Sequence, residues 1–319
     1  GKLAQPKRPG LRELFKIAGI SGKPISASTI AFAVAPRMNA AGRLGTAKTA
    51  VELLLTNDDR RAQEIAAELD RENKERQETE QQIHREALEL IANDPNFSAK
   101  KVIVLAREGW HNGVIGIVAS RLTEAFYRPC ILISINNGVG KGSGRSIPGF
   151  NLFDALTECE DLLTNFGGHA VAAGLGVNEN SIEAFSKKIN KYADSVLTEN
   201  DMIPSVKVDC ILSEHSLSLN MAKVISMLEP YGMGNERPVF VLKNAEVINV
   251  SAVGADKKHL RMRIAGNGVP VGCIGFGFGE YAEILKPGSR VHIAFRFDIN
   301  NYQGTENLQL QLADIKTAG

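Results

Sequence analysis

The sequence has 319 residues, of which 44% are hydrophobic and 23% charged, and its formal net charge is +1. This is the composition of a globular protein, and the length predicts two or three domains. No run of 18 apolar residues occurs, so we expect no membrane span. The four cysteines form no C-x-x-C pair, so we expect no zinc site and a reducing, cytoplasmic compartment.

The chain begins with Gly rather than Met, within a polar, basic stretch. We expect that it is a piece of a longer protein and that it has no signal peptide. Residues 1–57 hold nine Lys or Arg and two Asp or Glu, whereas residues 58–92 hold six and eleven. The remainder is close to neutral. General attraction to nucleic acid is therefore not expected, but the basic first segment can form a local anion-binding patch.

The basic segment contains a stretch rich in small residues, 35–45, which includes Arg37, Asn39 and Arg43. Small residues permit close backbone approach, and an arginine placed there can bind a phosphate through two nitrogens. The alternative is an exposed turn whose charges have no function.

Residues 58–92 contain no Gly or Pro and are rich in strong helix formers, which predicts one helix of about 50 Å. Both ends carry apolar positions, but none occurs between Asp70 and Gln82. We expect this middle part to be surrounded by solvent, in a helix that bridges two domains. A disordered charged linker is the alternative.

Residues 93–200 show the order strand, helix, strand that is typical of a βαβ unit with parallel strands. The ranges predicted for these elements are strands at 101–105 and 130–135, with helices at 113–126, 152–163 and 182–196.

A flexible, glycine-rich loop is predicted over 137–144, followed by Arg145 and Ser146. It matches neither the P-loop nor the Rossmann pattern, because required glycines and the Ser or Thr after Lys141 are missing. What remains are backbone N–H groups, the Ser143 hydroxyl and two cations, which suit a phosphate that is held but not transferred. A surface hairpin is the alternative.

Two further motifs are candidates for ligand contact. Gly167, Gly168 and His169 lie in a predicted turn, where glycines permit close approach and the imidazole can donate a hydrogen bond to a phosphate. Trp110 and His111 directly precede a predicted helix, whose N-terminus attracts anions, and the indole could stack on a base. The alternatives are a structural histidine and a core tryptophan.

From residue 206 onward, short alternating segments separated by Gly, Asn and Pro predict a small β-barrel or sandwich. The predicted strands are 206–211, 239–242, 245–252, 259–264, 269–276, 290–297 and 308–315. The densest cationic group here is Lys257, Lys258, Arg261 and Arg263. Candidate stacking surfaces for bases are Phe276, Phe278, Phe295, Phe297 and Tyr302, of which alternate members are expected to point into the core.

The chain contains no Asp-x-Asp, His-His or H-E-x-x-H string, and its twelve aspartates are scattered. A metal-dependent hydrolase needs clustered carboxylates and imidazoles to hold its ions. We therefore expect no metal-binding residues in this chain and no hydrolysis by the chain alone.

Five ordered motifs resemble the RecJ exonucleases of the DHH phosphoesterase family. They are APRMNAAGRLG at 35–45, WHNGVIGIVASRL at 110–122, KGSGRS at 141–146, FGGH at 166–169 and PYGMGNERPVF at 230–240. The resemblance, which runs from about Leu11 to Lys316, implies part of a 5′→3′ exonuclease that acts on single-stranded DNA in recombination and repair. It also implies an α/β plus β fold in four parts. These are the C-terminal part of a DHH catalytic domain (1–57), a long connecting helix (58–92), an α/β DHH-associated domain (93–200) and an OB-fold-like β-barrel (201–319).

The resemblance implies roles as well. Ser143 and Arg145 match residues that hold the 5′-terminal phosphate, assisted by Arg37 or Arg43, and His169 matches a catalytic position near the scissile phosphate. The full set of expected substrate-binding residues is Arg37, Asn39, Arg43, His111, Ser143, Arg145, Ser146, Gly167, Gly168, Lys257, Lys258, Arg261 and Arg263.

In the family, the Asp and His motifs that bind two Mn²⁺ or Mg²⁺ ions lie upstream of the part that this chain resembles. The expected ligand is single-stranded DNA with a 5′-phosphate, bound by a monomer, and the candidate protein partners are a single-stranded-DNA-binding protein or a helicase. Two alternatives remain open: another DHH phosphodiesterase that degrades oligonucleotides or nucleotides, and a non-catalytic, RecJ-like DNA-binding scaffold.

Overall fold

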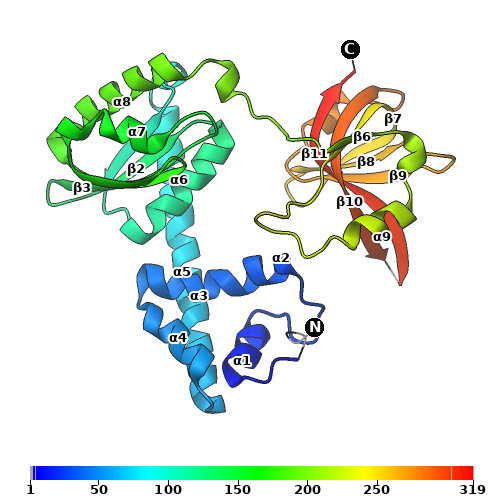
Figure 1. The fold of residues 1–319 in the computed structure, drawn as a ribbon, viewed down its shortest axis with the longest axis horizontal. Helices are drawn as coiled ribbons and strands as arrows, with labels where there is room; N and C mark the ends of the chain where they lie inside the picture. Colours follow the sequence, from blue (N-terminus) through cyan, green and yellow to red (C-terminus); the bar gives the residue numbers. More distant parts are fainter. Residues whose placement is uncertain (1–2, 4, 303, 319) are drawn as a thin grey trace. The chain divides into compact units, whose positions relative to one another are not determined.

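The computed structural model describes residues 3, 5–302 and 304–318, and the chain divides into two compact units, Gly1–Pro204 (unit 1) and Ser205–Gly319 (unit 2) (Figure 1). None of the helices in the described part is both long and apolar enough to cross a membrane.

Before Asp58, the regular elements of the described part of unit 1 are all helices. The elements are α1 (Pro9–Ile17), α2 (Ala27–Thr29), a π-helical segment (Ile30–Val34), α3 (Ala35–Leu44) and α4 (Ala47–Leu55). The small-residue stretch is therefore a helix and not an exposed turn. Pro36 lies in the first turn of α3, where its missing N–H costs nothing, and the fully buried Ala40 and Ala41 allow close packing between helices.

The long helix α5 (Asp59–Ala92) forms as predicted, and Asp58 caps it by accepting hydrogen bonds from the N–H groups of Arg60 and Arg61. The expectation that its middle part is surrounded by solvent is wrong. Four polar residues there are buried, and they continue the buried stripe formed by the apolar ends of the helix. These are Asp70, Asn73, Arg76 and Glu80, whose exposed fractions are 7%, 3%, 8% and 2%.

The rest of unit 1 is a five-stranded sheet with helices on both faces. Its strands are β1 (Ile103–Glu108), β2 (Cys130–Asn136), β3 (Val139–Arg145), β4 (Leu163–His169) and β5 (Ala172–Asn178), in the order β1-β2-β3-β5-β4. β1 and β2 are parallel and are joined by α6 (Asn112–Phe126), so the predicted βαβ unit is confirmed. α5 and α6 share a core on one face, and α7 (Leu152–Thr157, shorter than predicted) and α8 (Ile182–Val196) share a core on the other.

The prediction of a flexible loop over 137–144 is wrong, because most of this segment is the central strand β3. Its backbone pairs with β2 on one side and β5 on the other, so its N–H groups are used within the sheet and do not form a phosphate cradle. Glycine occupies every second position of β3 because the side chains of neighbouring elements pack directly against that face. A Cβ atom on Gly142 would lie 2.8 Å from the Leu175 side chain, so the buried face has no room for one. Lys141, Ser143 and Arg145 point to the opposite face.

Unit 2 is a six-stranded mixed sheet around its own core. The elements are β6 (Cys210–Leu212), α9 (Leu219–Ser226), β7 (Phe240–Val253), β8 (His259–Ile264), β9 (Val271–Gly275), α10 (Tyr281–Ile284), β10 (Arg290–Tyr302) and β11 (Thr305–Thr317). The strand order is β10-β11-β9-β8-β7-β6, and β10 also pairs with β7. The two strands predicted at 239–242 and 245–252 are one strand, β7, which passes through a left-handed Asn244 (φ 56°). Of the strand predicted at 206–211, only the last two residues lie in β6.

Candidate functional site

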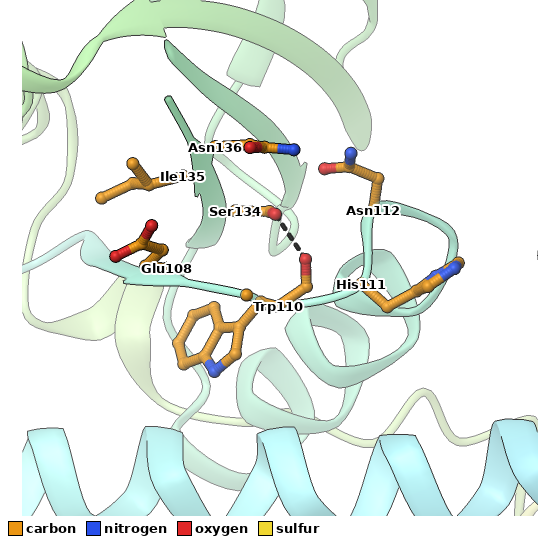
Figure 2. A pocket seen from close by; sticks show the side chains of 8 residues that line it. Glu108, Trp110, His111, Asn112, Ser134, Ile135 and Asn136 are labelled. Carbon is orange, nitrogen blue, oxygen red and sulfur yellow. Dashed lines mark hydrogen bonds between the residues drawn. The ribbon is translucent and has the colours of Figure 1, made fainter. Parts of the chain in front are cut away.

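The first turn of α6 lies at the carboxyl ends of the parallel strands β1 and β2. His111 caps this helix, because its Nδ1 accepts a hydrogen bond from the Gly113 N–H (3.1 Å). Trp110 is a core residue and offers no stacking surface for a base: it is 4% exposed, and its indole donates a hydrogen bond to Glu86 of α5 (2.7 Å), which lowers the pKa of that carboxyl. Figure 2 shows the Trp110 ring pointing toward α5 and His111 pointing away from the amides of Asn112 and Asn136. The cavity between these residues measures about 360 Å³.

Two arginines and a serine converge beside this turn. At the end of α3, Arg43 donates a hydrogen bond from Nη1 to the Gly113 carbonyl (3.0 Å). Ser143 and Arg145 of β3 lie against the next turn of α6, since a Cβ on Gly116 would be 2.8 Å from Ser143 Oγ and 3.0 Å from Arg145 Nη2. Gly113 and Gly116 thus bring three separate elements into contact.

The two arginines form a cluster of positive charge that no carboxylate among the described residues neutralises. Burial and the positive charge of Arg43 both lower the pKa of the Arg145 guanidinium. These arginines donate hydrogen bonds to the Gly113 and Gly144 carbonyls and to Ser143 Oγ. In the described part of the chain, neither arginine forms an ion pair with a carboxylate. An anion between them would relieve their repulsion and receive charge-assisted hydrogen bonds.

Arg37 and Asn39, the other two candidates in the small-residue stretch, do not lie beside Arg145. Arg37 is mostly buried and donates hydrogen bonds to Asp70 Oδ1 (2.8 Å) and to the Ala33 carbonyl (2.6 Å). Asn39 is exposed on α3. Arg43, and not Arg37, therefore lies beside Arg145.

A strip of small residues leads across the sheet from Arg145 to His169. Residues opposite each other on antiparallel strands point to the same face, and Ala172 stands opposite both Arg145 and His169. In the neighbouring row, Gly174 stands opposite both Ser143 and Gly167. Because adjacent strands are about 4.8 Å apart, Arg145 and His169 are separated by roughly 10 Å of sheet with no large side chain between them.

The FGGH motif is the end of strand β4, not a turn. Gly168 has φ of 148°, and a Cβ there would lie 2.4 Å from the Ala172 carbonyl oxygen, so its close approach is to β5 and not to a ligand. Gly167 has open space around it, and His169 is exposed. Ser146, which was expected to bind substrate, donates its hydroxyl to the Phe150 carbonyl (2.7 Å).

The cationic group of unit 2 is divided by the structure. Lys257 and Lys258 lie in the turn between β7 and β8, where Lys258 pairs with Asp256 (2.9 Å). Arg261 and Arg263 project from the exposed face of β8.

Of the expected stacking surfaces in unit 2, Phe276 is 58% exposed and packs edge-on against His259. Phe295 and Phe297 are both buried in the core, so these two cannot stack on bases, and Phe278 is partly buried against the core. The side chain of Tyr302 lies outside the described residues.

Comparison with known proteins assigns a class to each unit. The model of the DHHA1 domain matches residues 99–195, and that of the RecJ OB domain matches residues 208–314. The chain thus carries a DHHA1 domain followed by an OB domain.

The sequence as a whole is similar to single-stranded-DNA-specific exonucleases named RecJ. It is 39% identical to the Bacillus subtilis protein over 98% of this chain and 40% of that protein, and 36% identical to the Thermus thermophilus protein over 96% and 42%. The crystal structure of Thermus thermophilus RecJ in complex with Mg²⁺ matches all of this chain and 48% of that one, with a TM-score of 0.84 and 34% identity. This chain belongs to the RecJ family, and it spans about half or less of the length of these relatives.

A RecJ protein implies divalent metal ions, since solved relatives contain Mg²⁺ or Mn²⁺. The residues present do not fit such a centre: in the ranges that the structure describes, no three His, Cys, Asp or Glu side chains gather into a group that could hold a metal ion. No catalytic step through a metal is therefore assigned to this chain.

The two glycines of the FGGH motif test how β4 packs against β5, because only Gly168 lies close to β5. We expect Gly168→Ala to lower the free energy of unfolding by about 1–3 kcal/mol, because the new methyl group would collide with β5. Gly167→Ala, in open space one residue away, is expected to change it by less than about 0.5 kcal/mol. Urea unfolding followed by the fluorescence of the buried Trp110 measures both, and equal effects would contradict this placement.

Proposed function

We propose that this chain is the part of a 5′→3′ single-stranded-DNA exonuclease of the RecJ type that holds the 5′-terminal phosphate and the single strand. The observation that carries the proposal is the convergence of Arg43, Arg145 and Ser143 beside the first turns of α6. A terminal phosphate carries about 1.5–2 negative charges at pH 7, whereas an internal phosphodiester carries one. A site with two uncompensated arginines therefore favours a strand end.

Each group has a distinct task in this proposal. The guanidinium groups of Arg43 and Arg145 donate hydrogen bonds to the phosphate oxygens, and Ser143 adds its hydroxyl. The strip of Ala172 and Gly174 leaves room for the first nucleotide, so that the next phosphodiester comes toward His169. His169, the candidate catalytic residue, donates a hydrogen bond to that phosphate.

Unit 2 would hold the strand further from its end. Arg261 and Arg263 supply positive charge on one strand face, and the exposed Phe276 supplies a ring on which a base can stack. The match to a RecJ OB domain favours this role, and it favours single strands over the mononucleotides and dinucleotides that other DHH enzymes take. The protein is proposed to act as a cytoplasmic monomer, with a single-stranded-DNA-binding protein or a helicase as its partner.

The phosphate site predicts a preference for one chemical form of the DNA end. The chain should bind a 5′-phosphorylated oligo-dT more tightly than the 5′-hydroxyl form, and Arg145→Ala should abolish most of the difference. A charge-assisted hydrogen bond contributes about 1.5–3 kcal/mol, which corresponds to roughly 10- to 150-fold in affinity. Fluorescence anisotropy with a label at the 3′ end measures both ligands.

Two control variants separate this effect from a general loss of charge. Arg145→Lys keeps the charge but not the planar pair of donors, and it should retain part of the preference. Lys191→Ala removes an exposed charge from α8, outside the proposed site, and should retain all of it. If Arg145→Ala discriminates between the two ends as well as wild type does, these residues do not bind the phosphate.

Binding by unit 2 predicts a change in salt dependence. In the whole chain, Arg261→Ala/Arg263→Ala should weaken binding of 5′-hydroxyl oligo-dT and reduce the slope of log K against log salt by about 1.4, since each phosphate contact contributes about 0.7. The control Lys286→Ala/Lys316→Ala removes two other exposed charges of unit 2 and should leave the slope unchanged. Equal affinity of wild type for blunt duplex DNA would favour a protein-docking role for this unit.

We further infer that hydrolysis requires residues outside this chain. Purified chain with Mn²⁺ should leave 3′-labelled, 5′-phosphorylated single strands intact, because it offers binding groups but no cluster of metal ligands among its described residues. Gel analysis after prolonged incubation measures this. Turnover that survives repurification and is lost in His169→Ala would overturn the inference.

A further inference from the structure

The buried polar stripe of α5 lies between two separate hydrophobic cores. The first half of α5 packs with α1, α3 and α4, and its last third packs with α6 and the sheet. Asp70 and Glu80 are ten residues apart, about 15 Å along the helix. Buried charges cost stability unless they are paired, so Asp70 and Glu80 each need a partner of opposite charge.

Asp70 holds helix α3. Its Oδ1 accepts a hydrogen bond from Arg37 (2.8 Å), and its Oδ2 lies 2.8 Å from the Lys74 ammonium. Burial alone would raise the pKa of Asp70, but the hydrogen bonds from Lys74 and Arg37 outweigh it and hold the pKa below its usual value. The carboxylate is therefore charged at neutral pH, and it fixes α3 through a residue six positions before Arg43.

Glu80 holds helix α6. Its Oε2 pairs with Arg76 of the same helix, which also donates a hydrogen bond to Asn73 (3.3 Å). Its Oε1 lies 2.7 Å from Arg121 Nη2 of α6, an ion pair without hydrogen-bond geometry. The first turn of the same α6 contains Gly113, which contacts Arg43.

Helices α3 and α6 are in direct backbone contact beside Arg43. A Cβ atom on Gly113 would lie 2.5 Å from the Arg43 carbonyl oxygen, so the two backbones touch directly. A small displacement of either helix would move Arg43 relative to Arg145, and hydrogen bonds weaken steeply when distance and angle depart from their optimum.

We propose that Asp70 and Glu80 are positioning residues for the phosphate site: they tie α3 through Arg37, and α6 through Arg121, to one rigid helix, so that Arg43 and Arg145 stand at the spacing of a single phosphate. This inference rests on the proposed phosphate site. It gives Arg37 a role in phosphate binding that acts through Asp70 and requires no contact with DNA.

The test compares 5′-phosphorylated and 5′-hydroxyl oligo-dT, labelled at the 3′ end, with the whole chain. Asp70→Asn and Glu80→Gln keep the side-chain shape and remove the charge. Each is expected to lower the ratio of the two affinities about tenfold, the size of one charge-assisted hydrogen bond, while the affinity for the 5′-hydroxyl strand stays constant. In the background of Arg43→Ala, neither substitution should lower the ratio further, because coupled residues are not additive.

Controls distinguish positioning from loss of stability. Ile189→Ala removes a fully buried side chain from α8, on the other face of the sheet, so it should lower the melting temperature and keep the ratio. Arg121→Gln is the alternative variant if Asp70→Asn and Glu80→Gln do not fold, because Arg121 is half-exposed. It should also lower the ratio of the two affinities. An unchanged ratio in the folded network variants, or an equal fall in Ile189→Ala, would overturn the proposal. Absence of any preference in wild type would instead overturn the phosphate site itself.

Discussion

Arg43 and Arg145 lie side by side without a carboxylate partner in the described residues, and a folded chain keeps like charges together only where other interactions outweigh their repulsion. Three elements hold them: α3 supplies Arg43, β3 supplies Ser143 and Arg145, and α6 contacts both through Gly113 and Gly116. An anion bound between the two arginines would relieve this repulsion. In the proposed function, that anion is the terminal phosphate of a DNA strand.

Elements with a strong periodic pattern could be predicted from the sequence. The long helix, α8 and β8 were placed within a residue or two, and the parallel pair around α6 follows from its apolar runs. Strand β3 could not be recognised because its glycines are typical of loops. Its alternation was nevertheless the useful signal: Lys141, Ser143 and Arg145 are two residues apart, as side chains on one face of a strand must be.

The middle of α5 could not be predicted for a different reason. Asn73, Arg76 and Glu80 recur at helical spacing, but a polar stripe looks solvent-exposed unless the elements that cover it are known. Those elements supply Arg37 and Arg121, which lie far from the stripe in the sequence. The same limit prevented a choice between Arg37 and Arg43. That choice depends on Asp70, 33 residues beyond Arg37, which binds one arginine and leaves the other beside Arg145. Long-range pairing of charges thus decides which arginine lies beside Arg145.

The central claim is that Arg43, Ser143 and Arg145 bind the terminal phosphate of a DNA strand. A crystal structure of this chain with a short 5′-phosphorylated oligo-dT tests it most directly. The account predicts the terminal phosphate between the two guanidinium groups and within hydrogen-bond distance of Ser143 Oγ, with the strand running across Gly174 toward His169. A terminal phosphate bound elsewhere, with Arg43 and Arg145 making no contact to DNA, would contradict it.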